Sequence, residues 1–465
     1  MDPTRTAFSR EAWIVLLITG VAAFLTPFMV SAITVALPDL ARGLGLGAAW
    51  LSWIPGAYLI ATTVLLLPAG RLADQIGRKR VYLVGMTLYT LASTLCALAP
   101  ERWSLLAGRI LQGVGAALLF ATSLAILISS VPAPRRGEVL GINVAATYAG
   151  LTAGPFIGGL LTSTWGWRGV FWFNVPLGFA LVWLTARFLP ADRPAAGRVD
   201  PPSVLLYSLS LLGISIGLFR LPRWESIVLL FPGLVLLIWF WRRNQGVPVP
   251  LIDLVPFRLQ PGLKFANLAT LIHYSATYAV AFLLSLYLHH LHRLSPTAIG
   301  TILVTQPLMM ALFSPLAGRL SDRRNPRVIA TLGMAMTTLG LLALSFLTAT
   351  TPRPWIVVIL LWLGLGYALF SSPNTLSVMS AAGPTASGFA SSFLATMRIA
   401  GQMVSMGISA VVFARLIGSR AITGHPQLLL ASIRLCFAIC MVLGVLGVAA
   451  SLAGRIRSRV EAAEG

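Results

Sequence analysis

Three side chains with basic chemistry lie inside long apolar runs of this 465-residue sequence: Arg109, Arg398 and His273. A guanidinium in such a run is costly unless it faces a cavity or a polar partner, so neither arginine is expected to face lipid. His273 could exchange a proton near neutral pH, because an unperturbed imidazole has a pKa of about 6.5. The alternatives are structural: an arginine that ties helices together through backbone carbonyls, and a histidine that serves as a polar packing residue.

Carboxylates are missing from the same apolar runs. Each of the 13 acidic residues lies in a tail, in a loop or at the end of a predicted helix. A membrane-buried carboxylate would bind organic cations by charge and would exchange a proton for cargo. Without one, the proton-carrying candidates are His273 and, at the inner mouth, Asp74 and Glu138. The surplus of basic charge leads to the hypothesis that the ligands are anionic or neutral amphiphiles.

The apolar runs themselves define the class of protein. Apolar residues make up 57% of the chain and charged residues 10%, a balance that a water-soluble domain of this size would not keep. A spanning helix needs about 20 apolar residues, and this length predicts an all-α polytopic membrane protein with about fourteen helices. The runs begin near Trp13, Trp50, Arg80, Trp103, Glu138, Gly169, Ser203, Trp224, Lys264, Pro296, Pro326, Pro354, Ala386 and Leu428.

The basic residues indicate a membrane orientation. The net charge is +21, and clusters such as Arg78–Arg80 fall between apolar runs on one predicted side. By the positive-inside rule we expect a multi-pass protein of the inner membrane with both termini in the cytoplasm. The basic residues do not form one stripe with interleaved aromatics, so nucleic acid is not an expected partner. No metal site is expected, because the cysteines are too few and too deep in apolar runs: Cys96, Cys436 and Cys440.

A repeated segment predicts how the helices are organised. Ala69–Asp74 (AGRLAD) returns as Ala317–Asp322 (AGRLSD), each at the inner end of the second helix of a six-helix block. We therefore expect an N-terminal bundle over residues 1–190, a linker with two extra spanning helices over 191–262, and a C-terminal bundle with a cytoplasmic tail over 263–465. Parallel halves of this kind place the substrate site at their interface, near the middle of the membrane.

The loop after this segment carries glycine, arginine and aspartate at short spacing. Glycine permits a tight turn, and Asp74 can accept charge-assisted hydrogen bonds from guanidinium groups or a helix amino terminus. The alternative is a solvated basic loop that only sets topology. Residues 70–80 resemble the signature loop of the major facilitator superfamily, which implies a latch on the cytoplasmic face in the outward-open state. The gating residues expected on this basis are Gly70, Arg71, Asp74, Gly77, Arg78, Lys79, Gly318, Arg319 and Asp322.

The fourth predicted helix contains the sequence RILQGVGAA from Arg109 to Ala117. This stretch resembles the RxxxG-type fourth-helix motif of the same superfamily. The resemblance implies a role for Arg109 in substrate recognition or in proton coupling. The residues that we take as coupling candidates are Arg109, Gln112, His273 and Arg398.

The fifth predicted helix has glycines at four-residue intervals, which make a smooth face for close helix approach. A proline beside them predicts a kink. Small-residue packing alone would account for such a face. The order GxxxGPxxGG, however, resembles the motif that marks antiporters of the superfamily, and it implies a hinge between the halves formed by Gly150, Gly154, Pro155, Gly158 and Gly159.

With fourteen helices the whole pattern is similar to the drug:proton antiporter branch of the superfamily, which has two additional central helices. The chain departs from this branch in the first helix. Members usually carry an acidic residue a few positions before an Asn-Val-Ala-Leu-Pro segment, and Met29 occupies the matching position here. Strong selectivity for dicationic drugs is therefore not expected.

These features predict a secondary transporter that exports lipophilic or amphiphilic small molecules of the multidrug-efflux type by alternating access. The proton gradient is the expected energy source, and no cofactor is expected. The alternative is a dedicated lipid or anionic-metabolite exporter with atypical coupling. An enzyme is not expected, since the sequence shows no paired catalytic acids, no nucleophile with a histidine and no zinc triad on facing helices. We expect a monomer in contact with membrane lipid, and the sequence specifies no adaptor protein.

Polar and aromatic residues in the spans are candidates for the cavity wall, because a lipophilic ligand needs apolar surface with a few polar groups. The alternative for each aromatic residue is packing or a place in the interfacial belt. The substrate-binding candidates, chosen by helix position, are Tyr58, Asn143, Tyr148, Tyr274, Tyr278, Gln306, Tyr367 and Gln402.

Overall fold

A computed structural model describes residues 10–131, 136–190, 200–221, 224–248, 250–252, 261–418 and 425–464. All regular secondary structure in these ranges is helical, and fourteen segments within them are long and apolar enough to cross a membrane. The predicted fold class is therefore confirmed. The helices are α1 (Arg10–Leu44), α2 (Ala48–Ile76), α3 (Arg78–Leu98), α4 (Arg102–Ser129), α5 (Arg136–Trp165), α6 (Trp167–Phe188), α7 (Pro201–Arg220), α8 (Glu225–Asn244), α10 (Pro261–Thr277), α11 (Val280–His290), α12 (Pro296–Leu303), α13 (Thr305–Arg323), α14 (Pro326–Ser345), α15 (Arg353–Leu416) and α16 (Pro426–Glu464).

Local signals set where several helices begin. In α7 the Asp200 carboxylate accepts a hydrogen bond from the Ser203 backbone N–H, and prolines occupy the first turn. The side chains of Ser295 and Asn325 cap α12 and α14 in the same way. Proline after a capping residue favours a helix start, because the first-turn N–H groups have no partner within the helix. The long apolar runs behind these caps stay helical, since a bilayer offers no water to satisfy free backbone groups.

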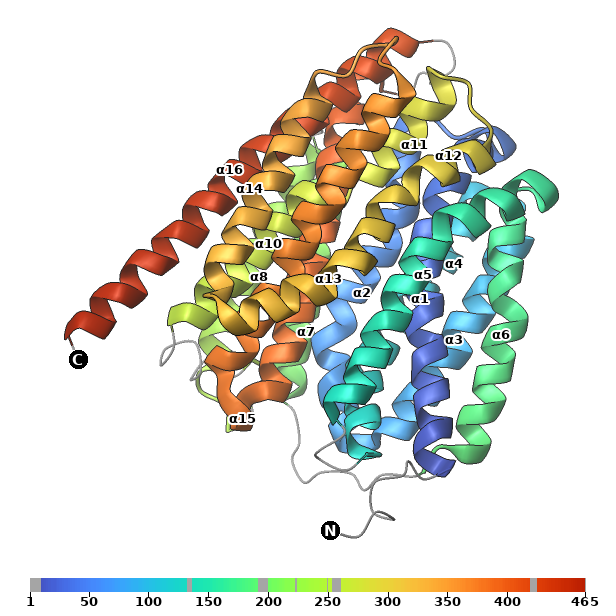
Figure 1. Ribbon diagram of the computed structural model, residues 1–465. Helices are drawn as coiled ribbons and strands as arrows, with labels where there is room; N and C mark the ends of the chain where they lie inside the picture. Colours follow the sequence, from blue (N-terminus) through green and yellow to red (C-terminus); the bar gives the residue numbers. More distant parts are fainter. Residues whose placement is uncertain are drawn as a thin grey trace.

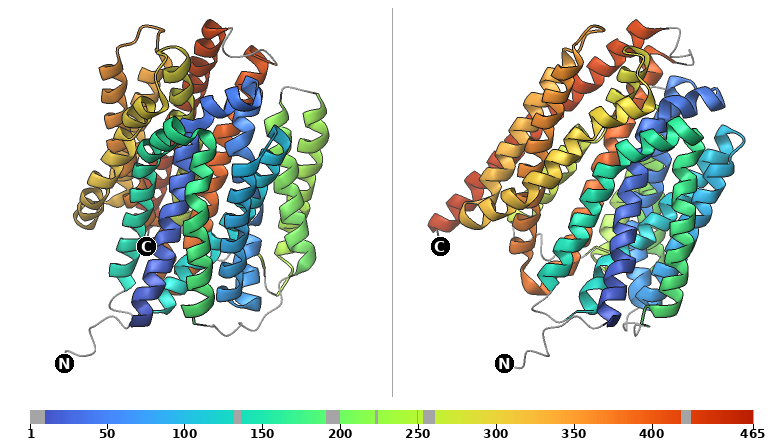
Figure 2. Two further views of the ribbon diagram at one scale, coloured as in Figure 1. Left: turned by 90° about the vertical axis from the view of Figure 1, so that its right-hand side faces the viewer. Right: turned by 45° about the vertical axis from the view of Figure 1, so that its right-hand side comes forward.

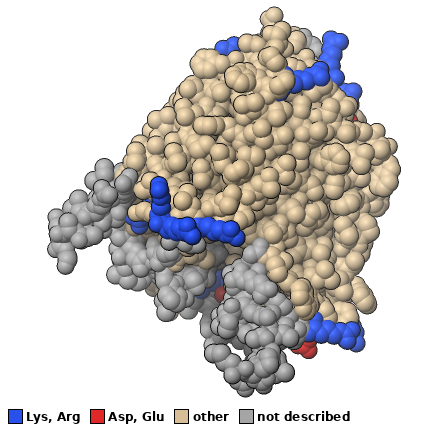
Figure 3. Space-filling model, viewed as in Figure 1, with Lys and Arg blue, Asp and Glu red and all other residues tan. Residues whose placement is uncertain are grey.

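The helices form one bundle in which α1–α6 lie on one side and α10–α16 on the other (Figure 1). Figure 2 shows the same division from two further directions. The turns α2–α3 and α13–α14, which directly follow the repeated segment, lie at the same end of the bundle as the start of α1. Figure 3 shows Lys and Arg side chains towards the two ends of one face, with a broad band free of charged side chains between them. Such a band is what a bilayer core requires.

Glycine contacts repeat between the two halves. A Cβ at Gly113 of α4 would collide with the Tyr58 carbonyl of α2, and a Cβ at Gly364 of α15 would lie 2.5 Å from the Gln306 carbonyl oxygen of α13. The pair α3–α4 meets through Gly85 and Gly115, and the pair α14–α15 meets through Gly333 and Gly366. Tyr58 and Gln306 stand in the same register relative to the repeated segment. Equivalent helices of the two blocks therefore pack through equivalent residues.

The segment α15 differs from the sequence prediction of separate helices beginning near Pro354 and Ala386. Its helical backbone is continuous from Arg353 to Leu416, yet the chain folds back, because Tyr367 and Arg398 both contact the ring of Tyr274. In a straight helix these 31 residues would span about 46 Å. Figure 1 shows the reversal at the lower end of the bundle. The two predicted crossings remain, as Arg353–Met379 and Phe393–Leu416.

Two spans that the sequence predicts as single helices are interrupted. The ninth breaks between α10 and α11, where the backbone N–H of Ala279 donates to Ser405 Oγ at 3.1 Å. The tenth breaks at Val304, between α12 and α13. A hydroxyl from another helix can satisfy an amide that leaves the helical pattern, so such a break is tolerated inside a membrane bundle.

The extra helices α7 and α8 form a hairpin that packs on both halves. Phe219 of α7 contacts Gly56 of α2, and the neighbouring Leu218 contacts Gly407 of α15. The ends of the hairpin are joined by a bidentate ion pair, in which Arg243 donates from Nε at 2.7 Å and from Nη2 at 2.9 Å to the Asp200 carboxylate. The hydrogen bond from Arg243, together with that from Ser203, holds the pKa of Asp200 well below its usual range.

Candidate substrate and coupling site

An aromatic and basic cluster lies inside the C-terminal half. The imidazole of His273 on α10 is buried, stacks on Phe370 with the ring centroids 3.8 Å apart, and has Tyr367 at 4.9 Å. Its Nε2 atom is buried and has no hydrogen-bond partner. A buried ring nitrogen without a hydrogen bond costs desolvation free energy, so this atom is a position where a bound ligand could supply the missing partner.

Arg398 extends the same cluster from the returning arm of α15. Its guanidinium lies over the ring of Tyr274 at 5.2 Å, and Tyr274 in turn contacts Tyr367 with the ring centroids 5.5 Å apart. The Nε atom of Arg398 is buried without a hydrogen-bond partner. A guanidinium over an aromatic face is stabilised by the ring quadrupole, and the Nε–H of Arg398 still needs an acceptor. The cluster therefore offers donors and ring faces, and it contains no carboxylate.

The cluster reaches the boundary between the halves. The hydroxyl of Tyr148 on α5 lies 3.5 Å from Ser371 Oγ on α15. Tyr148 and Leu151 also pack against the buried group that contains Tyr274, Tyr367 and Phe370. The structure thus adds two residues that the sequence analysis missed, Phe370 and Ser371. It brings them together with five residues singled out from the sequence: His273, Tyr274, Tyr367, Arg398 and Tyr148.

Arg109 and Tyr58 form a separate polar group in the N-terminal half. Arg109 is 1% exposed, donates from Nε to the Ile54 carbonyl at 3.2 Å and from Nη1 to Gln112, and lies 4.7 Å from the centre of the Tyr58 ring. Gln112 donates onward to Ser93 Oγ at 2.8 Å. These bonds tie α2, α3 and α4 together, which is the structural role considered from the sequence. A coupling role for Arg109 and Gln112 stays a prediction.

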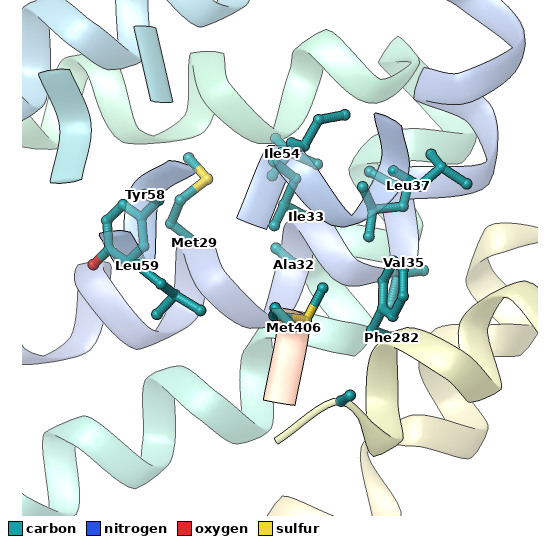
Figure 4. Close-up of a cluster of buried hydrophobic side chains, with 14 of the residues drawn as sticks. Met29, Ala32, Ile33, Val35, Leu37, Ile54, Tyr58, Leu59, Phe282 and Met406 are labelled. Atoms are coloured by element: carbon teal, nitrogen blue, oxygen red, sulfur yellow. The ribbon is translucent and has the colours of Figure 1, made fainter. Parts of the chain in front are cut away.

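Met29 lies in the central apolar cluster, beside Tyr58 and Leu59 (Figure 4). It is fully buried, and the cluster takes residues from both halves, including Phe282 and Met406. The position where an acid was expected is therefore enclosed by apolar side chains. The environment fits the thioether and would not hydrate a carboxylate.

The remaining substrate-binding candidates contact other parts of the bundle. Asn143 donates to the Thr19 carbonyl of α1 at 3.4 Å. Tyr278 packs against the central apolar cluster at the α10–α11 break. Gln306 and Gln402 are partly buried on α13 and α15. Their roles in binding stay predictions.

The loop between α2 and α3 has the tight turn that its glycine predicts. Gly77 has a φ of 99°, in the region that favours glycine. Arg78 forms an ion pair with Asp74 at 3.5 Å, Arg71 donates to the Pro250 carbonyl at 2.6 Å, and Lys79 donates to the Ala186 carbonyl at 3.3 Å. In the second copy, Gly318 faces Ser372 and Arg319 is exposed. The side chains of Asp322 and Glu138 lie outside the described residues.

The glycine motif of α5 serves two different neighbours. Gly150, Gly154 and Gly158 press against α1, where a Cβ at Gly154 would lie 2.6 Å from Ser31 Cβ. Gly159 and Pro155 instead meet α12 of the other half: a Cβ at Gly159 would lie 2.6 Å from the Pro296 carbonyl oxygen, and Gly300 packs directly on the Pro155 carbonyl. The motif therefore joins the halves at the end of the bundle opposite the start of α1.

The described residues contain no group of three His, Cys, Asp or Glu side chains placed to hold a metal ion. What they contain is a polytopic helix bundle with two matching six-helix blocks and a polar cluster at their boundary. This arrangement defines the class of secondary membrane transporters.

Comparison with known proteins identifies the family. The model of the Major Facilitator Superfamily matches residues 19–406 and 266–464. The chain belongs to the major facilitator superfamily and is a multi-pass membrane transporter. The resemblance seen in its motifs is therefore confirmed.

Relatives with a described function include transporters of several small molecules. The riboflavin transporter RibZ of Clostridioides difficile is 32% identical over 393 residues, covering 84% of this chain and 85% of that protein. The multidrug resistance protein Stp of Mycobacterium tuberculosis is 32% identical over 420 residues, covering 87% and 76%. The methylenomycin A resistance protein of Streptomyces coelicolor is 31% identical over 397 residues, covering 82% of each.

A solved structure supports the fold alone. It is a bacterial homologue of the human lysosomal transporter Spinster in an inward-facing and unoccupied conformation, with a TM-score of 0.69 and 17% identity. The match covers 97% of this chain and 98% of the other.

Proposed function

We propose that the protein exports amphiphilic small molecules that are anionic or neutral, and that the cluster around Arg398 and His273 binds them. The observation that carries the proposal is the pairing of buried nitrogen atoms that lack partners with ring faces: Arg398 Nε and His273 Nε2 have no hydrogen-bond partner, and Tyr274 and Tyr367 lie beside them. An acceptor group on a planar ligand would accept a hydrogen bond from Arg398 Nε, would accept one from His273 Nε2 in the tautomer or charge state that carries a proton there, and would stack on a ring. Relatives named for drug resistance and for riboflavin transport support small organic cargo.

The location of the cluster supports alternating access. Tyr148 belongs to one half and the other cluster residues belong to the second, so a rocking motion of the halves would make and break the contact of Tyr148 with Ser371. Binding that changes with the relative position of the halves is what couples cargo to transport.

The test uses purified protein in proteoliposomes with paired fluorescent dyes of matched size, one anionic and one cationic. We expect the anionic dye to move at least about tenfold faster, because the site contains a guanidinium whose Nε lacks a partner and contains no carboxylate. Arg398→Gln should remove the difference, whereas Arg415→Gln, which replaces an exposed arginine on the same helix, should keep it. Preferential movement of the cation would contradict the proposal.

We further propose that protons drive this export from a cytoplasmic membrane in which both termini lie inside, with His273 as the carrier. His273 is the one titratable imidazole in the cluster, and no carboxylate of the described spans lies beside it. Dye efflux from cells of an exporter-deficient host should stop when a protonophore is added. Efflux that persists with the protonophore would overturn proton coupling and leave the cargo proposal standing.

A dedicated exporter of one anionic metabolite is the second candidate. The same cluster favours it, since a single guanidinium and a single imidazole could select one ligand geometry. Competition assays distinguish the two: a broad exporter is inhibited by many unrelated amphiphiles, and a dedicated exporter by one chemical class.

A further inference from the structure

A groove opens between α14 and α15 at the end of the bundle opposite the start of α1. Its volume is about 670 Å³, and its walls include Ala343, Phe346, Trp355 and Trp362. This volume is in the range of ligand-binding clefts, about 300–1,000 Å³. The site takes no part in the cluster around Arg398, and none of the sequence motifs touches it.

The groove exists because the two helices pack tightly below and separate above. A Cβ at Gly340 of α14 would lie 2.5 Å from Leu363 Cδ2 of α15, and a Cβ at Gly333 would lie equally close to the Gly366 carbonyl oxygen. Beyond this contact the walls of the groove carry bulky aromatics, among them Phe346 and Trp355. Trp362 fixes the floor, because its Nε1 donates to the Met336 carbonyl across the gap at 2.8 Å.

The length of the groove matches one leaflet of a membrane. It runs from Pro352 at the loop to Trp362 on α15, which is about 15 Å at the rise of an α-helix. Half of the hydrocarbon core of a bilayer is also about 15 Å thick. Phe346 and Trp355 are 66% and 61% exposed, so the walls face the lipid and not the interior of the bundle.

Three threonines line the mouth of the groove, and two arginines lie next to residues that line it. Arg353 is exposed one residue after Pro352, and Arg434 of α16 is exposed and donates from Nε to the Ser345 carbonyl at 3.1 Å, beside Phe346. The sequence has no Asp or Glu between Pro326 and Val460. Neither arginine forms an ion pair with a described carboxylate. Threonines 348, 350 and 351 line the same rim.

We propose that this groove binds one anionic phospholipid from the leaflet at that end of the protein, with an acyl chain between α14 and α15 and the phosphate at Arg353 and Arg434. The groove is apolar along a leaflet-length track and positively charged where a headgroup would lie, and only a lipid combines these features in one molecule. The threonine hydroxyls would donate to the remaining phosphate oxygens.

The test is native mass spectrometry of the full-length protein in detergent with added phosphatidylglycerol or phosphatidylcholine of the same chain length. We expect about tenfold more bound phosphatidylglycerol, because two cations at a lipid surface favour an anionic headgroup. Substituting both arginines, Arg353→Gln with Arg434→Gln, should lower phosphatidylglycerol to the level of phosphatidylcholine. Ala343→Trp, which fills the groove, should lower both lipids.

Two control variants make the same kinds of change outside the groove, one the loss of an arginine and the other the addition of a tryptophan. Arg102→Gln removes an arginine at the same end that stacks over Trp50, and Val445→Trp adds a ring to an exposed site on α16; both should bind lipid as the parent does. Unchanged phosphatidylglycerol binding in the double arginine variant would overturn the proposal. A dimer that Ala343→Trp dissociates, with no lipid bound, would also overturn it and assign the groove to a second copy of the chain.

Discussion

The imidazole of His273 lies flat on the ring of Phe370, with 24° between the two planes and 3.8 Å between their centres. The stack leaves Nε2 without a partner inside a span. If this nitrogen carries the transported proton, its loss should uncouple transport without removing the site.

His273→Gln should lower proton-driven dye transport in proteoliposomes by about tenfold, because glutamine keeps a donor but does not titrate near neutral pH. Counterflow exchange of labelled for unlabelled dye needs no net proton movement, so it should stay within about twofold of the parent. Phe370→Leu is the matched control, since it removes the stack and keeps the imidazole. An equal fall of both activities in His273→Gln would assign the residue to packing alone.

Met29→Asp restores an acid at the position where the drug:proton antiporter branch usually has one. Met29 lies in an apolar environment but beside Tyr58, whose ring supports the Arg109 guanidinium, and this cation would help to keep the new carboxylate negative near the centre of the bundle. We expect transport of a cationic dye to rise several-fold. The free energy of unfolding should fall by about 1–3 kcal/mol, which is the cost of a poorly paired buried polar group. Met29→Asn, of similar size without charge, should lose stability and gain no cation transport.

The sequence predicted the crossings well because their signals are local. Each span is a run of apolar residues, and the repeat of Ala69–Asp74 at Ala317–Asp322 predicted matching blocks, which the equivalent contacts of Gly113 and Gly364 reflect. The breaks at Ala279 and Val304 were not predictable in the same way. The first depends on the Ser405 hydroxyl, which lies 126 residues further along the chain. A long-range hydrogen bond leaves no local pattern.

The site was predicted only in part for a related reason. Tyr148, Tyr274 and Tyr367 meet, whereas Gln306 and Gln402 were chosen by depth in the membrane, and their roles in binding stay predictions. The depth of a residue in the membrane follows from its position along an apolar run. The helix face on which the residue lies does not, because a helix that is apolar all round has no periodic signal. Phe370 went unnoticed since phenylalanine in a span is usually a packing residue.

Asp74→Asn tests the proposed latch. The Asp74–Arg78 pair is solvent-accessible, so its loss should cost at most about 1 kcal/mol of stability. We nevertheless expect dye efflux from an exporter-deficient host to fall about tenfold, because the carboxylate would be needed as a charged acceptor during the cycle. The amount of protein in the membrane, measured by immunoblot, should not change. Efflux equal to the parent would count against the latch.

Asp200 is an acid at the same end of the bundle as Asp74, but Asp200→Asn should affect the stability of the protein and not the transport cycle. Its folded pKa is lowered, chiefly by the hydrogen bond from Arg243, so the pair stabilises the protein above the unfolded pKa of about 3.9. That contribution is lost as the pH falls below this value towards the folded pKa. The variant should melt at a lower temperature than the parent at pH 7, and the difference should shrink as the pH falls through about 4 and below. A constant difference would show that the charge of Asp200 is not the cause.

Gly300→Ala should open the contact between the halves at the end opposite the start of α1. Gly300 packs on the Pro155 carbonyl with no space for a Cβ, and both partners are backbone, so the halves must separate to relieve the clash. Overpacking of this kind costs about 1–3 kcal/mol, which would raise the open population by about 5- to 150-fold. The reporter is Ser285→Cys, since Ser285 is buried and donates to the Thr34 carbonyl of the other half at 2.7 Å.

Maleimide should label this cysteine about tenfold faster in detergent when Gly300→Ala is present, the rate following the open population. The background is low because the three native cysteines are buried. Gly20→Ala is the control, since a Cβ at Gly20 meets no atom within 4 Å, and it should leave the rate unchanged. Equal labelling in all three proteins would mean that the Gly300–Pro155 contact does not hold this end closed, and that the antiporter-like motif only packs helices.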